Sequence, residues 1–170
     1  ADHVAMLFDQ PTEGHIYSRI SNPTVECLEN KISALEGGVG ALCTSSGQAA
    51  TFTAVMNICE KGDHIVSSGT IYGGTFNLFD VTFRKMGLDV TFVDQDATQE
   101  EIQKAFRPNT KILFGETIAN PKISILDIEK FARIAHKNGV PLIVDNTFAT
   151  PVLLNPFIYG ADIITHSTTK

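Results

Sequence analysis

Short apolar runs alternate with amphipathic stretches along most of the chain. Each apolar run is short and is bounded by polar or glycine residues, so it predicts a buried strand. The stretches between them repeat apolar residues at intervals of three and four, which predicts helices. Strands are predicted over residues 39–44, 64–68, 89–93, 111–115, 141–144 and 162–165. Helices are predicted between Asn22 and Gly37 and over 48–59, 75–86, 99–106 and 128–138.

The predicted strands lack the two-residue alternation of a sheet that exposes one face to water. Strands that are apolar throughout and alternate with helices indicate an α/β fold, with a mostly parallel sheet and helices on both faces. In such sheets ligands bind outside the carboxyl ends of the strands. Residues 1–16 are predicted to form an irregular N-terminal arm, and residues 17–170 a single large domain.

Three helix starts carry capping signals. Asn22 can cap a helix that has Pro23 at its first position. Thr98 and Glu101 have the spacing of a capping box, and Asp127 can cap the helix that follows it. These signals support the predicted helix boundaries.

Composition and charge exclude several classes of protein. A net charge of -6 and a pI near 5.3 argue against nucleic-acid binding, which needs a basic surface. No apolar run approaches the roughly 20 residues of a membrane span, and no basic region of a signal peptide opens the chain. Cys27, Cys43 and Cys59 are therefore expected to be reduced core thiols of a cytoplasmic protein. They have no close Cys or His pair, so we expect no metal site.

The last stretch of the chain is a candidate for covalent chemistry. A buried strand is followed by Ser167, Thr169 and Lys170. A lysine held at a strand end can form a Schiff base with an aldehyde, and hydroxyl and backbone N–H groups beside it can hold a phosphate. Taken alone, this stretch is far more often a solvated tail than a cofactor site.

A second candidate is the turn before the helix at 48–59. Ser46, Gly47 and Gln48 follow a predicted strand, and a strand–turn–helix arrangement directs free N–H groups and the helix dipole at an anion. The turn is neither a P-loop nor a Gly-x-Gly-x-x-Gly motif, because Cys43 stands where the third glycine belongs. The residues alone therefore predict only a possible phosphate site.

Other polar residues follow the ends of other predicted strands. Asp145, after a buried strand, could keep the nitrogen of a pyridine ring protonated, which makes the ring an electron sink. Tyr72 could stack on such a ring, and Asn120 could donate a hydrogen bond to its phenolic oxygen. Asp145 could equally be a turn cap. Tyr17 and Arg19, which precede the first helix, are by themselves typical surface residues.

Six motifs in this order resemble the Cys/Met-metabolism family of pyridoxal-phosphate enzymes. They occupy residues 17–24, 44–49, 71–76, 116–121, 144–151 and 166–170. The resemblance implies fold type I, with residues 17–170 as an incomplete cofactor-binding large domain. It implies that Lys170 carries pyridoxal 5'-phosphate, and that Tyr17 and Arg19 reach the phosphate of a neighbouring subunit in a dimer of dimers. It also implies a substrate-carboxylate arginine and a small C-terminal domain beyond Lys170.

Within the family, residues 46–50, 72–79 and 145–151 resemble the branch of O-acetylhomoserine sulfhydrylases. The implied reaction is γ-replacement, in which acetate leaves Cγ of the substrate and a sulfur donor takes its place. Lys170 would take the Cα proton, and Lys170 or Tyr72 would carry protons in the later steps. Methionine γ-lyases usually carry a cysteine where this chain has Gly74. Methionine γ-lyase, cystathionine γ-synthase and cystathionine γ-lyase activities stay open as alternatives.

Overall fold

The computed structural model describes residues 5–7 and 14–170. Most of the predicted arm over residues 1–16 lies outside this range. The chain divides into two compact units, residues 1–43 and residues 44–170. Each unit is described by itself below.

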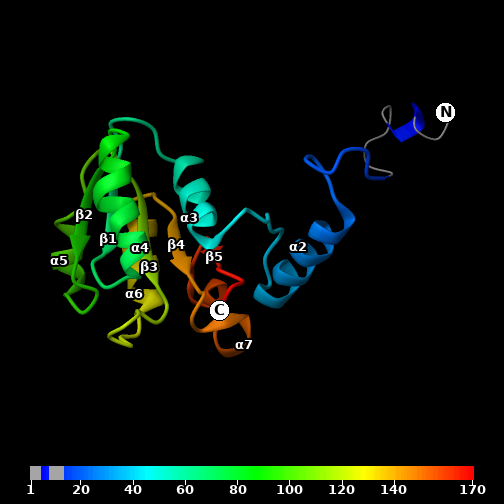
Figure 1. The fold of residues 1–170 in the computed structure, drawn as a ribbon. Helices are drawn as coiled ribbons and strands as arrows, with labels where there is room; N and C mark the ends of the chain where they lie inside the picture. The colour runs from blue at the N-terminus through cyan, green and yellow to red at the C-terminus, as the bar shows by residue number, and fades with distance from the viewer. Residues whose placement is uncertain (1–4, 8–13) are drawn as a thin grey trace. The chain divides into compact units, whose positions relative to one another are not determined.

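The larger unit is built on a five-stranded parallel sheet (Figure 1). Its strands are β1 (His64–Ser68), β2 (Asp89–Val93), β3 (Thr110–Glu116), β4 (Leu142–Asp145) and β5 (Ile163–Thr165). Their order across the sheet is β2-β1-β3-β4-β5. The chain therefore leaves β1 toward one edge and returns to add β3 on the other side. Five of the six predicted strands are confirmed, each within two residues of its predicted bounds.

Two apolar cores lie on the two faces of the sheet. Neighbouring residues of a strand point to opposite faces, so Ile112 and Phe114 of β3 join one core and Leu113 joins the other. The core that contains Ile112 also contains residues of α3 and η2, whereas the core that contains Leu113 is covered by α6. Both faces are therefore dry, and each fully buried Phe or Leu contributes roughly 1.5–3 kcal/mol.

The helices of this unit follow the capping signals closely. They are α3 (Gly47–Met56), α4 (Gly73–Asn77), the π-helix η2 (Leu78–Phe83), α5 (Gln99–Gln103), α6 (Ile128–Lys137), α7 (Thr150–Leu153) and the 3-10 helix η3 (Pro156–Tyr159). Both halves of the Thr98 and Glu101 capping box are formed, and the Asp127 side chain accepts from Lys130 N–H. The predicted helix over 75–86 is α4 continued by η2, and the one over 99–106 is shorter than expected.

The smaller unit contains α2 (Pro23–Glu36), capped by Asn22 as predicted. The strand predicted over 39–44 is wrong: residues 39–44 form no strand, and the side chains of Val39 and Leu42 are exposed. The N–H of Cys43 donates to the Glu29 carboxylate at 2.7 Å rather than to a neighbouring strand. An apolar run without a strand partner has no ladder to join, which a local pattern cannot reveal.

The three cysteines are free thiols, but only Cys59 is buried. Cys27 is exposed on α2, so the expectation that it lies in a core is wrong. Among the residues that the structure describes, no helix combines the length and the apolar composition needed to cross a bilayer.

His64 of β1 links its strand to both neighbouring strands. Its Nδ1 lies 2.7 Å from Thr110 Oγ1 on β3, and its Nε2 lies 2.9 Å from Thr91 Oγ1 on β2. The side chain is fully buried. Burial lowers the pKa of His64, with a further lowering from Arg107, so the neutral ring is the form that stabilises the fold.

We predict that His64→Gln lowers the thermal unfolding midpoint, and by less at acidic pH. Glutamine can keep only one of the two hydrogen bonds, which costs about 1 kcal/mol at about pH 7.5. Because the folded pKa lies below the unfolded one, the wild type itself loses stability as pH falls from the unfolded value through the folded value. Unfolding should be followed at about pH 7.5 and about pH 5.5. A difference that stays constant or grows at the lower pH would contradict this account.

Candidate functional site

Polar side chains gather at the carboxyl edge of the sheet, where the register of parallel pairing aligns them. Glu116 of β3 pairs with Asp145 of β4, and Asp145 pairs with Thr165 of β5. Glu116 is two residues after Phe114, and Asp145 is two after Ile143, so both acids belong to the face that α3 and η2 cover. This edge lies next to the reversal of strand order between β1 and β3, the place where open α/β sheets bind ligands.

Asp145 is a half-buried carboxylate with few local donors. Its Oδ1 accepts from the N–H of Thr147 at 2.9 Å, and the Thr147 side chain also hydrogen-bonds to it. Burial raises the pKa of Asp145, while the Thr147 hydrogen bonds and nearby His166 oppose the rise. An anion held in this way is poorly solvated, so a cationic hydrogen-bond donor would stabilise it.

The turn into α3 lies directly against the segment after β5. A Cβ built on Gly47 would stand 2.6 Å from Ser167 Cβ and 3.0 Å from Ser167 Cα. Ser46 caps the helix by accepting from Ala49 N–H at 3.1 Å, which leaves the N–H groups of Gly47 and Gln48 without a partner inside the helix. The structure thus brings together free N–H groups and the Ser167 hydroxyl, as an anion site requires.

Ser167 is also linked to Asp145. Its N–H donates to Thr147 Oγ1 at 2.8 Å, and Thr147 in turn bonds the Asp145 carboxylate. The candidate phosphate turn and the candidate ring acid are therefore two ends of one short hydrogen-bonded chain.

Tyr72 lies at the start of α4, between this edge and the solvent. Its ring is half-exposed and lies over Gly74, since a Cβ at Gly74 would meet Tyr72 Cε1 at 2.5 Å. α4 is connected to α3 by Gln48, whose Nε2 donates to Thr75 Oγ1 at 3.0 Å. Tyr72 and Gln48 are thus held on neighbouring helices that cover the same face.

Glu116 is the residue of this edge that the sequence patterns did not single out. It is 5 % exposed, and its Oε2 accepts from Tyr72 N–H at 2.5 Å. Burial, with a smaller contribution from Asp145, raises the pKa of Glu116 to about 7, although the Tyr72 N–H opposes the rise. An acid that ends a buried strand is the same signal that marked Asp145, and it could have marked Glu116.

Among the described residues of the larger unit, three predicted site residues make no hydrogen bond to this cluster. Asn120, Thr169 and Lys170 are exposed, Asn120 four residues beyond β3 and the other two beyond Ser167. Tyr17 and Arg19 belong to the smaller unit. There they contact one another: Arg19 Nε lies 3.4 Å from the Tyr17 hydroxyl, and its guanidinium lies 5.0 Å from the ring centroid.

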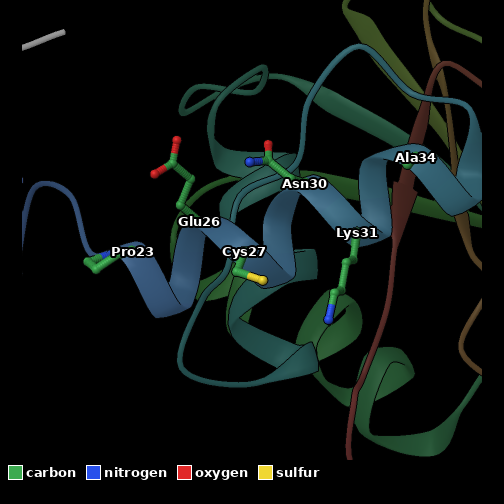
Figure 2. Close-up of a pocket in the computed structure, with 6 residues that line it drawn as sticks. All are labelled: Pro23, Glu26, Cys27, Asn30, Lys31 and Ala34. Carbon is green, nitrogen blue, oxygen red and sulfur yellow. The ribbon is translucent and has the colours of Figure 1, made fainter. Parts of the chain in front are cut away.

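A shallow hollow on the smaller unit is not part of this cluster. Figure 2 shows it along one side of α2, lined by Pro23, Glu26, Cys27, Asn30, Lys31 and Ala34. All six residues come from a single helix, and none is a predicted site residue. The hollow is an open helix surface without converging polar groups.

Comparison with known proteins adds the family context. The profile of the family described as "Cys/Met metabolism PLP-dependent enzyme" matches residues 1–170. An O-acetyl-L-homoserine sulfhydrylase from Corynebacterium glutamicum is 51% identical over 170 residues, which are 100% of this chain and 39% of the relative. A homocysteine/cysteine synthase from Kluyveromyces lactis is 51% identical over 169 residues, 99% of this chain and 38% of the relative. An L-methionine gamma-lyase from Fusobacterium nucleatum is 46% identical over 158 residues, 92% of this chain and 40% of the relative.

Solved structures agree with these relatives. An O-acetylhomoserine (thiol)-lyase from Campylobacter jejuni, which contains a pyridoxyl-lysine phosphate, is 41% identical with a TM-score of 0.91 and covers 99% of this chain and 41% of that chain. An O-acetylhomoserine sulfhydrylase from Wolinella succinogenes is 38% identical with a TM-score of 0.81 over 85% of this chain and 41% of that chain. The chain spans about two fifths of the length of the curated relatives it matches.

We predict that Gly47→Ala destabilises the protein even though alanine favours helices. The higher helix preference of alanine would add roughly 0.5–1 kcal/mol to the stability of the fold. The added methyl group overlaps the backbone and side chain of Ser167, however, and overpacking of this kind typically lowers stability by about 1–3 kcal/mol. Gly73→Ala, at the first position of α4 with nothing within 4 Å, is the matched control and should be neutral or stabilising. Thermal unfolding of both variants measures the difference. Equal midpoints would show that α3 does not press on Ser167.

Proposed function

The chain belongs to the Cys/Met-metabolism family of PLP-dependent enzymes, and from this premise we propose that the protein replaces the acetate group on Cγ of O-acetylhomoserine with the sulfur of a donor such as sulfide. The products are homocysteine and acetate, as in methionine biosynthesis. The observation that carries the proposal is the linked pair of sites at the sheet edge, Asp145 at one end and the Ser167 turn at the other. The 51% identity to a relative named O-acetyl-L-homoserine sulfhydrylase supports the choice of substrate.

The residues present fit pyridoxal 5'-phosphate. A phosphate needs N–H and hydroxyl donors, and these are supplied by Ser46, Gly47, Gln48 and Ser167, with Thr169 beyond them. A protonated pyridine nitrogen is a cationic donor, the partner that the half-buried Asp145 carboxylate favours. Asn120 would donate to the phenolic oxygen of the ring, and Tyr72 would cover its face. Lys170 would hold the aldehyde carbon through its Nζ.

When bound, pyridoxal phosphate supplies an aldehyde that condenses with amines and a ring that withdraws electrons from the substrate. Asp145 would keep a proton on the ring nitrogen. Lys170 would take the proton from Cα of the substrate through its Nζ. Lys170 or Tyr72 then carries protons so that acetate departs from Cγ and the sulfur donor takes its place. We place this reaction in the cytoplasm, where free thiols such as Cys59 stay reduced.

A methionine γ-lyase activity is the second candidate, because a relative of that name is 46% identical. Position 74 bears on the choice: the Tyr72 ring occupies the space where any side chain at Gly74 would begin. A cysteine, usual there in methionine γ-lyases, would have to displace the ring. Gly74 therefore favours the sulfhydrylase reaction.

We predict that the full-length protein turns over O-acetylhomoserine with sulfide at least about tenfold faster, in kcat/KM, than it eliminates from methionine. The measurement compares homocysteine formed from the first pair of substrates with α-keto acid formed from the second. Preference for methionine would favour the lyase reaction. Absence of turnover with both substrates would overturn both proposals.

We further propose that each site is completed by a neighbouring subunit within a dimer of dimers. Tyr17 and Arg19 present a hydroxyl and a guanidinium that lie close together and are exposed. A guanidinium can hold a phosphate through two hydrogen bonds, worth about 1.5–3 kcal/mol for a charge-assisted contact. If the phosphate belongs to another subunit, cofactor binding and subunit association are thermodynamically linked.

A mixing experiment tests this shared site. We predict that Arg19→Ala and Lys170→Ala proteins are each nearly inactive, and that activity returns when their subunits are exchanged. In a mixed dimer one site receives wild-type Arg19 from one subunit and wild-type Lys170 from the other. Lys170→Ala mixed with Lys170→Arg is the control that cannot complement. Exchange without recovered activity would mean that Arg19 serves the site of its own subunit.

A further inference from the structure

Glu116 ends the strand next to Asp145 and contacts the backbone of a proposed catalytic residue. Its carboxylate accepts the N–H of Tyr72 at 2.5 Å, which joins the end of β3 to the loop that leaves β1. Tyr72 itself is half-exposed, and no side chain caps α4 at this residue. The position of the Tyr72 backbone therefore depends on a buried acceptor from another strand.

The loop over residues 69–72 has one other buried side-chain anchor among the described residues. Ser68 Oγ accepts from Thr70 N–H at 3.1 Å, at the start of the loop. Gly69 N–H donates to Val93 O of β2 at 2.8 Å. The Ser68 bond ties the start of the loop to β1 and the Gly69 bond ties it to β2, whereas Glu116 holds the last residue of the loop toward β3. Since β2 and β3 flank β1 on opposite sides, the two anchors fix different ends of the loop.

A carboxylate in this place lowers the stability of the fold at high pH. Glu116 is buried, and its pKa is raised to about 7, mainly by burial and then by Asp145 on β4. The loop presents only the Tyr72 N–H, and neither α3 nor α4 contains a titratable side chain. The helix η2, which also covers this face, contains Asp80, and that carboxylate is paired with Arg84 on the exposed side. Stability from the protonated acid is therefore lost as pH rises from the unfolded value through about 7. If position 116 served only to stabilise the fold, an uncharged side chain would be favoured there over an acid.

We propose that Glu116 is a positioning residue, whose reach to the Tyr72 N–H fixes that tyrosine at the carboxyl edge of the sheet. The inference deepens the proposed function and rests on it, because Tyr72 matters as the residue that covers the ring and carries protons. Glu116 itself touches neither substrate nor cofactor in this scheme. It acts through the backbone of Tyr72.

Two substitutions distinguish the contribution of the length of the Glu116 side chain from that of its charge. Glu116→Asp keeps the charge but is one methylene shorter, so it cannot reach the Tyr72 N–H without moving the loop. Glu116→Gln keeps the length and an acceptor oxygen but removes the charge. Ser68→Ala is the matched control, because it releases the other anchor of the same loop.

Amide hydrogen exchange of the purified full-length protein, resolved at Tyr72, gives a readout that does not depend on turnover. We expect Tyr72 to exchange at least about tenfold faster in Glu116→Asp and at the wild-type rate in Glu116→Gln and Ser68→Ala. We expect kcat/KM to fall about 100-fold in Glu116→Asp and to be largely restored by glutamine. Glu116→Gln should also unfold at a higher temperature than the wild type above pH of about 7, with the difference shrinking toward acidic pH.

The opposite pattern would overturn the proposal. If glutamine is as damaging as aspartate in both exchange and kcat/KM, charge rather than position is what the site needs. Unchanged exchange at Tyr72 in Glu116→Asp would show that Glu116 does not hold the loop. If the wild type lacks the proposed activity, the proposed function fails by itself, and the exchange data still decide whether Glu116 positions Tyr72.

Discussion

The register of the parallel sheet is the constraint on which the other features of the larger unit depend. Each strand pairs with its neighbours so that the last residues of β3, β4 and β5 form one row. The row is dry below, because the residues of β3 and β4 just before the edge are fully buried. Polar side chains can be accommodated only at this carboxyl end of the strands, where helices α3 and α4 begin and can supply hydrogen-bond partners. The position of Asp145 and Glu116 is thus a consequence of strand pairing rather than of loop geometry.

Much of this larger unit follows from local sequence signals. Five apolar runs became strands and the caps at Thr98 and Asp127 formed, because burial, spacing and capping favour the same structure in each case. The placement of Ser46, Gly47, Ser167 and Asp145 near one another also follows from a general property of parallel sheets, whose carboxyl ends lie at one edge. Residues that come directly after a strand or open a helix were therefore the easiest to predict.

What could not be predicted depends on partners distant in sequence. The run at 39–44 has the composition of a strand, but its own residues do not indicate whether a neighbouring strand is available for pairing. Glu116 carries the same strand-end signal as Asp145, but its role depends on a bond to Tyr72, 44 residues away, that no local pattern encodes. The exposure of Cys27 could not be predicted for the same reason, because the apolar face of a helix does not indicate which element covers it. The joint action proposed for Tyr17 and Arg19 came from family resemblance, and the sequence pattern alone favoured plain surface residues.

The alternation of side chains along β3 and β4 makes the site sensitive to chain length in an unusual way. Odd and even positions of these strands serve different cores, so losing one residue within β4 would shift Asp145 from the face of α3 to the face of α6. There it would meet Phe131 and Ile134, which carry no donor for it. Single-residue insertions or deletions inside these strands should therefore be far rarer among functional homologues than changes of apolar side-chain type. The loops that follow the strands are not under this constraint, and they can vary in length without moving the strand-end side chains to the opposite face of the sheet.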